Sequence, residues 1–177
     1  MDIVSHILIG KILSFNKKKK AQFWAMFFSL LPDLSQIPFY LVLGYENARP
    51  FLFPLNSDWI GARQLHPILS ALWEAPHSLF FAILIILPII IFFKLPKIAF
   101  FSYVIHLIVD IPTHSGEWAI KIFYPIDYTI NGFTDAWAWP VWGFILSWII
   151  LISIVIVLNR FLKLKNDNSS NPNRRNS

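Results

Sequence analysis

The feature that most restricts the fold of this chain is a run of 24 residues between Asp135 and Arg160 that contains no charged side chain. A helix needs about 20 predominantly apolar residues to cross the hydrocarbon core of a bilayer. A second run of nineteen residues, between Glu74 and Lys94, also lacks Asp, Glu, Lys and Arg. Of the 177 residues, 56% are hydrophobic and 14% are charged, whereas soluble domains carry about 25% charged residues. We therefore expect an integral membrane protein with the lipid bilayer as a partner.

The apolar segments predict an all-α membrane protein, a polytopic bundle of about five helical segments in one domain over residues 1–162. The expected segments are residues 1–15, 21–44, 75–93, 98–111 and 136–159. The first is short, because its helix would extend about 22 Å and the hydrocarbon core is about 30 Å thick. Pro32 and Pro38 predict that the second is a broken helix. Residues 163–177 are rich in Lys, Arg, Asn and Ser, and we expect a disordered basic tail there.

The basic residues predict the orientation of this bundle. The topology places eleven Lys and Arg residues on one side of the membrane and three on the other. The side with eleven comprises residues 17–20, residues 94–97 and the region that starts at Arg160. Cytoplasmic loops carry an excess of basic residues, so we expect the four-lysine loop and the C-terminus in the cytoplasm. The net charge of +5 is then a topology signal, and no nucleic-acid partner is expected.

Residues 102–116 place two imidazoles and a carboxylate in a largely apolar segment. Residues four apart lie on one face of a helix, so His106 and Asp110 should present a nitrogen and an oxygen to the same point. Pro112 should end or kink the helix, which leaves His114 free to fold back. Neutral imidazole and carboxylate together suit zinc, manganese or iron better than calcium. The alternative is that His106 and Asp110 only bond to each other or to a neighbouring helix.

Other segments contribute further ionisable residues to the same end of the predicted bundle. The candidate metal ligands of the whole chain are His6, Asp33, His77, His106, Asp110 and His114. Ionisable groups within membrane segments are costly and indicate function by default. Because four segments carry them toward the outer leaflet, we expect a shared metal or catalytic site. The chain has no Cys, so the ligands would be nitrogen and oxygen atoms only.

Four short motifs occur in an order that resembles a known family. They are His6-x-x-x-Gly10, Leu30-Leu31-Pro32-Asp33, His77-Ser78, and His106-x-x-x-Asp110 followed by Thr113-His114-Ser115-Gly116. Over most of residues 1–116 the chain resembles the bacterial inner-membrane family of membrane-bound metal-dependent hydrolases, which is distantly similar to zinc-dependent phospholipase C. The resemblance implies a multi-pass protein of the bacterial cell inner membrane that binds a divalent metal, with zinc expected and manganese or iron as alternatives.

One motif departs from the pattern of this family. Many members carry His-Arg-Gly-x-Thr ahead of the His-Ser pair, and here those positions are Leu72, Trp73, Glu74, Ala75 and Pro76. One ligand and a cation suited to phosphate are therefore missing. Glu74 could supply an oxygen ligand instead, but we favour a solvated residue at the start of a helix. We expect His66, which lies outside the motifs, to be a surface or loop histidine.

The expected activity is metal-dependent hydrolysis of a phosphoester or ester in a lipid or lipid-linked substrate near the outer leaflet. A bound metal lowers the pKa of a water toward 7 and polarises the substrate oxygen. Asp33 is expected as a ligand or general base, and Asp33 and His114 are the expected catalytic residues. Ser78, Thr113 and Ser115 could orient the ligands through hydrogen bonds or could cap helices and form turns.

Two alternatives to an enzyme are left open by the sequence, as is the oligomeric state. Intramembrane His and Asp residues can relay protons or metal ions, which would make the chain a small membrane carrier or assembly protein. Buried polar pairs can also be purely structural. Substitution of Asp110 by alanine separates these alternatives from the enzyme. It should abolish hydrolysis if the chain is an enzyme, abolish ion flux if it is a carrier, and only destabilise the protein if the polar pairs are structural.

Overall fold

The computed structural model describes residues 2–170, and all of their regular secondary structure is helical. The β interaction found in this part of the chain is an isolated bridge between Ile120 and Ile130. The all-α prediction is therefore confirmed. The helices are α1 (Ile3–Leu13), α2 (Lys19–Leu34), α3 (Ile37–Glu46), α4 (Ala62–Leu65), α5 (Pro67–Glu74), α6 (Leu79–Phe81), α7 (Leu87–Phe92), α8 (Lys97–Asp110) and α9 (Val141–Ser170). A π-helical stretch, Ala82–Ile86, joins α6 to α7, and a 3-10 turn, η1 (Pro50–Leu52), follows α3.

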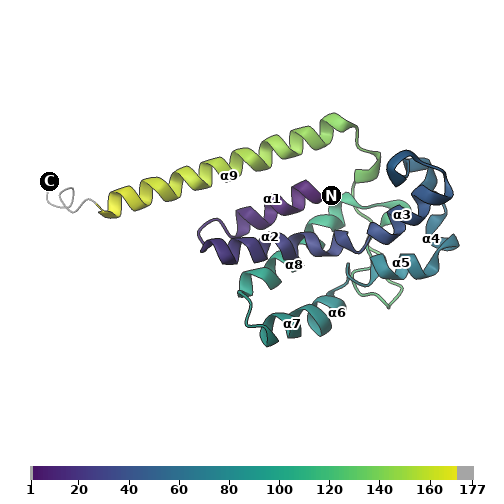
Figure 1. Cartoon of the computed structure of the whole chain (residues 1–177), viewed down its shortest axis with the longest axis horizontal. Helices are drawn as coiled ribbons and strands as arrows, with labels where there is room; N and C mark the ends of the chain where they lie inside the picture. The colour runs from purple at the N-terminus through teal and green to yellow at the C-terminus, as the bar shows by residue number, and fades with distance from the viewer. Residues whose placement is uncertain (1, 171–177) are drawn as a thin grey trace.

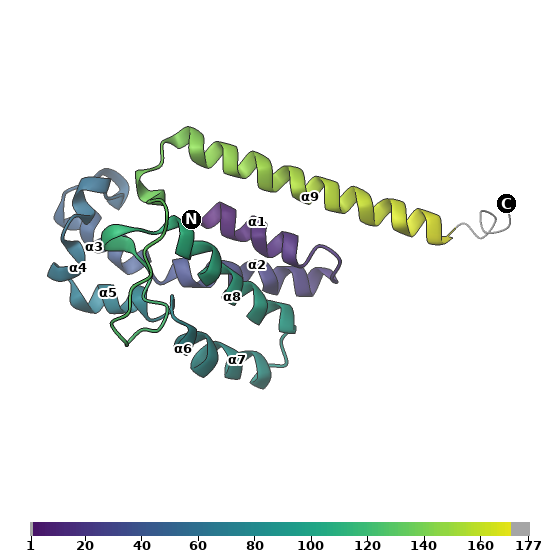
Figure 2. The same ribbon diagram turned by 180° about the vertical axis from the view of Figure 1, so that it is seen from behind.

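Helix α8 lies at the centre of the bundle. Figures 1 and 2 show α1, α2 and α8 packed together, with α9 along α1 on one side and α6 and α7 on the other. Helices α3, α4 and α5 group at one end, and the α1–α2 and α7–α8 connections lie at the opposite end (Figure 1). The buried face of α8 contributes Tyr103 and Leu107 to the apolar core. Its polar residues at the same depth are therefore enclosed by neighbouring helices.

Two helical segments are long and apolar enough to cross a membrane. Lys19–Glu46 spans 28 residues across α2 and α3, and Val141–Asn168 of α9 spans 28 residues with a mean hydropathy of 2.8. A third candidate is the pair Pro67–Glu74 and Leu79–Phe92, whose parts meet at a bend of 61°. These two or three segments indicate a membrane protein. Helices α1 and α8 have 11 and 14 residues, so the predicted total of five membrane segments stays a prediction.

The helices are interrupted within the second predicted segment and at the start of the third, and a candidate site residue lies at each interruption. Pro32 lies in the last turn of α2, and Ser35 beyond it donates a hydrogen bond of 2.6 Å to the Pro32 carbonyl. Between α5 and α6, the Ser78 hydroxyl accepts a backbone N–H of the first turn of α6 at 3.1 Å. Backbone groups freed at such breaks must contact protein or a wet cavity rather than lipid. Asp33 and His77 therefore lie where the chain faces the protein interior.

Helix α1 is held between α2 and α9 by a small residue and an N-terminal cap. A Cβ atom at Gly10 would lie 2.8 Å from the Ala25 carbonyl oxygen of α2, so a larger residue would push the two helices apart. The Asp2 carboxylate accepts two backbone N–H groups of α1, at 3.0 and 3.1 Å, and Nε1 of Trp148 in α9 at 2.8 Å. The spacing His6-x-x-x-Gly10 thus places an imidazole one helical turn from this close contact between α1 and α2.

Helix α9 continues into the region for which the composition predicted a disordered tail. It ends at Ser170, so residues 163–170 are helical, while residues 171–177 lie outside the described residues. Nucleation of a helix is unfavourable, but each residue added to an existing helix gains a hydrogen bond. The Leu and Lys residues at 162–165 are good helix formers. They extend the apolar helix, and the helical region is longer than predicted.

Candidate metal centre

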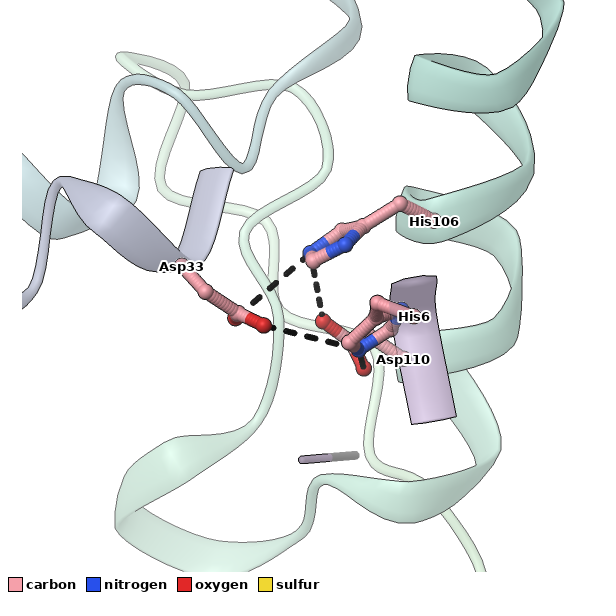
Figure 3. Close-up of side chains that lie close together, drawn as sticks. All are labelled: His6, Asp33, His106 and Asp110. Carbon is pink, nitrogen blue, oxygen red and sulfur yellow. Dashed lines mark ion pairs between the residues drawn. The ribbon is translucent and has the colours of Figure 1, made fainter. Parts of the chain in front are cut away.

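Four polar side chains converge from α1, α2 and α8 (Figure 3). His106 and Asp110 lie one turn apart on α8, with His106 Nε2 3.0 Å from Asp110 Oδ2. His6 Nε2 approaches the other oxygen, Asp110 Oδ1, at 3.0 Å. The carboxylate oxygens of Asp33 lie 3.9 Å from His6 Nε2 and 3.8 Å from His106 Nε2. One ligand atom from each of the four lies within 4.8 Å of the others, so the group could hold a metal ion.

His77 adjoins this group of four from the break between α5 and α6. Its Nε2 lies 3.8 Å from a carboxylate oxygen of Asp33 and also 3.8 Å from one of Asp110. It is 3.4 Å from His106 Nε2. The rings of His6 and His106 stack on one another with their centroids 3.7 Å apart. His77 is therefore a third imidazole next to the four side chains that could hold an ion.

Backbone carbonyl groups determine which ring nitrogen of His77 and His106 faces the centre. His106 Nδ1 is 2.7 Å from the Ser29 carbonyl oxygen, and His77 Nδ1 is 2.7 Å from the Trp73 carbonyl oxygen. A carbonyl oxygen only accepts, so each Nδ1 carries the proton and each neutral ring presents the lone pair of Nε2 to the centre. Metal-ligating histidines usually donate their second N–H in this way.

The atoms that meet at the centre are therefore mainly acceptors. The Nε2 atoms of His77 and His106 lie 3.4 Å apart, and that of His106 also lies 3.0 Å from an Asp110 oxygen. In the neutral form of both rings these contacts bring acceptors together, and the carboxylates of Asp33 and Asp110 add two negative charges. Within residues 2–170, His6 Nδ1 and Asp33 Oδ2 lack a hydrogen-bond partner. A divalent cation would neutralise the charge and satisfy several acceptors, and mixed nitrogen and oxygen donors suit zinc, manganese or iron.

Asp33 is the member of the group of four that reaches a cavity. Its side chain is 12% exposed, whereas those of His6, His106 and Asp110 are 0–1% exposed. The cavity has a volume of about 500 Å³ and is lined by Asp33, by His114 and by mainly apolar side chains of α1, α3, η1 and α9. Ligand pockets commonly have about this volume. A small molecule in the cavity would therefore lie directly beside the group.

The structure places His114 at the wall of this cavity rather than in the group of four. Its Nδ1 donates to the Asp110 backbone carbonyl at 2.9 Å and lies 3.8 Å from Asp110 Oδ1. The Thr113 hydroxyl lies 3.3 Å from the same nitrogen. Burial lowers the pKa of the His114 imidazole to about 4, so the ring is neutral at pH 7. His114 therefore lies beside the cavity with its Nδ1 engaged by a backbone carbonyl, and its expected role as a metal ligand stays a prediction.

The position of Glu74 fits neither of the two roles considered from the sequence, an oxygen ligand or a solvated residue at the start of a helix. Its side chain is buried and pairs with Arg63 and with Lys121, whose Nζ lies 3.5 Å from Glu74 Oε1. Glu74 is thus not solvated, and it does not belong to the group of four. The Arg63 guanidinium also lies over the Trp73 ring, 5.0 Å from its centroid. The motif that departs from the family pattern therefore forms an ion pair behind the cavity wall.

The remaining polar residues of the motifs have structural positions. His66 lies between α4 and α5, and its Nε2 is 3.0 Å from Glu46 Oε2, as expected for a histidine in a loop. Ser78 caps α6. Ser115 precedes a 3-10 turn and makes no side-chain capping hydrogen bond there. Of the three hydroxyl groups predicted to orient ligands, only that of Thr113 lies within hydrogen-bonding distance of a candidate site residue, His114.

Sequence reasoning missed three residues that contribute to the site. The Ser29 hydroxyl donates to the His6 carbonyl at 2.7 Å while its own carbonyl holds His106. Trp73 acts through its backbone carbonyl, which no side-chain pattern can indicate. Gln36 is 5% exposed and lines the cavity, and its amide nitrogen lacks a hydrogen-bond partner among the described residues. Ser29 lies four residues before Asp33, and Gln36 lies three residues after it. Helical spacing could therefore have indicated that both lie on the same face as Asp33.

Comparisons of the chain with protein-family models, with curated proteins and with solved structures found no match. The resemblance to membrane-bound metal-dependent hydrolases therefore stays a prediction based on the four motifs. The candidate site rests on a separate observation, which is the geometry of the polar atoms around Asp110.

Proposed function

We propose that the chain is a membrane-embedded metal-dependent hydrolase that acts on an ester or phosphoester bond of a lipid or lipid-linked substrate. The observation that carries this proposal is the meeting of imidazole lone pairs and two carboxylates beside a cavity. The residues that would hold the ion are His6, Asp33, His106 and Asp110, with His77 as a further ligand. When bound, a divalent ion polarises the substrate oxygen and lowers the pKa of water toward 7.

The chain's own residues have distinct roles in this proposal. Asp33 lines the cavity, so its carboxylate can accept a hydrogen bond from the attacking water and orient it. His114, neutral at pH 7, lies at the cavity wall, where its second ring nitrogen can accept a proton from the water and pass it to the leaving group. The Ser29 and Trp73 carbonyls hold His106 and His77 in the tautomers that ligation requires.

The five-segment topology and its orientation belong to the same proposal. The α1–α2 connection, the α7–α8 connection and the C-terminal half of α9 lie toward one end of the molecule (Figure 1). These three regions carry the basic residues 17–20, 94 and 97, and 160–165. The positive-inside rule would place this end in the cytoplasm of a bacterial cell, with the metal centre toward the outer leaflet of the inner membrane. A site at that depth suits a lipid-linked substrate.

Metal content and turnover in one preparation test this function. Protein purified in detergent should contain near-stoichiometric zinc, manganese or iron, and the His106→Ala/Asp110→Ala double variant should contain none. His66→Ala is the matched control, because this histidine lies outside the group, and it should keep the metal. Hydrolysis of labelled acyl and phosphoester lipids should disappear with the metal. Protein that binds no metal after reloading would overturn the proposal, and metal flux across sealed vesicles without hydrolysis would identify a carrier instead.

A further inference from the structure

The cavity beside Asp33 is open to an apolar surface. Its walls include Leu41 of α3, Phe51 of η1 and Phe144 of α9. Leu41 is 48% exposed and Phe51 is 94% exposed, so both also belong to the outer surface of the molecule. In a membrane such side chains contact acyl chains, since exposed apolar surface is stable in lipid. An apolar tail can therefore enter the cavity from the bilayer while its polar group reaches Asp33.

The charge of the cavity opposes an anionic head group. Among the described residues that line it, Asp2 and Asp33 are acidic, and none is Lys or Arg. One divalent ion between two carboxylates and neutral imidazoles forms a centre with no net charge. A phosphodiester placed there would meet the negative charge of Asp2 and no Lys or Arg side chain. An uncharged carbonyl group would meet no such repulsion.

The basic residues at this end of the bundle are already paired. The Arg49 guanidinium bonds Asp58 in a bidentate manner at 2.7 and 2.8 Å. Arg63 pairs with Glu74 and also donates to the Glu117 carbonyl. Lys121 lies 3.0 Å from Asp127 and 3.5 Å from Glu74. These ion pairs satisfy the three basic residues that the predicted topology assigns to the outer side, and none of these three residues lines the cavity.

Gln36 provides the polar group that an ester would need. Its side chain is 5% exposed and lines the cavity together with Asp33. Its amide nitrogen is buried and lacks a hydrogen-bond partner among residues 2–170. A buried donor without a partner is unfavourable, and a ligand oxygen would remove this penalty. Donors placed where negative charge develops on a carbonyl oxygen are a main source of catalysis in acyl transfer.

We propose, on the basis of the hydrolase function above, that the substrate is an uncharged lipid with a long-chain carboxylic ester and that the Gln36 amide binds its carbonyl oxygen. The oxygen of a water molecule forms a bond to the acyl carbon, and the bond from that carbon to the alcohol oxygen breaks. The alcohol leaves with one proton of the water, and the fatty acid keeps the oxygen and the other proton of that water. Asp33 orients the water, and the exposed apolar walls hold the tail.

Three matched probes test the substrate class with metal-loaded protein in detergent. They are a long-chain umbelliferyl ester, the acetate of the same fluorophore, and an alkyl umbelliferyl phosphodiester. We expect the long-chain ester to be hydrolysed at least about 100-fold faster than the phosphodiester. Leu41→Trp, which fills the mouth of the cavity, should slow the long-chain ester but not the acetate. Faster turnover of the phosphodiester would overturn this inference and leave the hydrolase function standing.

Substitution of Gln36 tests the role of its amide. Gln36→Ala and the isosteric Gln36→Glu should lower kcat for the long-chain ester by about 100- to 1,000-fold, as loss of one oxyanion donor does, and both should keep the metal. Gln64→Ala, at an exposed glutamine of α4, is the control and should keep full activity. Equal activity of wild type and both Gln36 variants would refute the assigned role.

If none of the probes is hydrolysed, the hydrolase function itself is refuted. A binding measurement still decides the ligand class in that case. A diacylglycerol with a diazirine in its acyl chain is cross-linked to the protein, with and without metal, and the labelled peptides are mapped. We expect labels within residues 36–53 and 141–148, with competition by unlabelled diacylglycerol and none by phosphatidic acid. Labels elsewhere, or equal competition by phosphatidic acid, would overturn the inference of an uncharged lipid ligand.

Discussion

Asp110 contacts three histidines of the candidate site. Its two carboxylate oxygens lie 3.0 Å from His6 Nε2 and from His106 Nε2, and its backbone carbonyl accepts from His114. Without a bound cation, this fully buried carboxylate carries a large desolvation cost. Its charge therefore favours metal binding but does not stabilise the metal-free fold. An isosteric substitution can separate these two effects.

Asp110→Asn should remove the metal without weakening the metal-free fold. The loss of affinity should exceed the roughly 10- to 100-fold that follows loss of an outer-shell partner. The Asn amide can donate to His106 Nε2, so in a chelator the variant should unfold at the same Tm as wild type or higher. Elemental analysis and thermal unfolding in detergent measure both effects. A metal-free variant that unfolds well below metal-free wild type would contradict this account of the centre.

Two buried serines should respond in opposite ways to alanine. The Ser29 hydroxyl donates to the His6 carbonyl, whereas the Ser102 hydroxyl has no hydrogen-bond partner among the described residues, and both side chains are fully buried. Ser29→Ala should lower the free energy of unfolding by about 1–3 kcal/mol because a buried carbonyl loses its donor. Ser102→Ala should be neutral or stabilising. Denaturant unfolding of the two variants checks this, and equal losses would contradict the assigned bonds.

Among the elements, α1 depends on close contact with α2. This contact carries His6 to the carboxylate of Asp110, so the position of a whole helix determines one metal ligand. Helix α1 has only 11 residues, and isolated helices of that length are marginally stable. Its packing against α2 and α9 therefore has to supply its stability.

Gly10→Ala should disturb both the helix contact and the metal centre. Its Cβ would lie 2.8 Å from the Ala25 carbonyl oxygen, and overpacking of this kind costs about 1–3 kcal/mol. Gly143→Ala in α9 is the control, because a Cβ there would lie 3.7 Å from its nearest neighbour, Trp139. We expect a lower Tm and weaker metal binding for the first variant and an unchanged or higher Tm for the second. Equal Tm values would show that α1 tolerates a larger spacing.

The sequence predicted those parts of the site that follow from helical spacing and topology. His106 and Asp110, four residues apart, do lie side by side, and the prolines of the second segment do mark a break beside Asp33. The sequence did not predict the orienting carbonyls of Ser29 and Trp73, because a backbone contact between distant segments leaves no side-chain pattern. The ion pair of Glu74 was missed for a related reason. Its partner Arg63 lies in the short helix α4, whose position depends on tertiary packing.

For the whole molecule, the proposed topology places both ends of α9 and every basic cluster on defined sides of the membrane. The absence of Cys from the sequence makes single-cysteine labelling straightforward. Cysteine at Lys18 and at Lys97 should react with a membrane-impermeant maleimide only in inverted vesicles. Cysteine at Gln64 should react in intact spheroplasts. Reaction of all three from the same side would refute the five-segment arrangement, although the metal centre could persist in another topology.

The most direct test of the central claim is X-ray absorption spectroscopy of the metal-reconstituted protein. The proposed centre predicts a first shell of nitrogen and oxygen at about 2.0–2.2 Å from zinc, with the outer-shell scattering typical of two or more imidazoles. That imidazole scattering should be weakened in His106→Ala and unchanged in His66→Ala. A spectrum with oxygen neighbours only, or one unchanged by His106→Ala, would contradict a metal centre formed by His6, Asp33, His106 and Asp110.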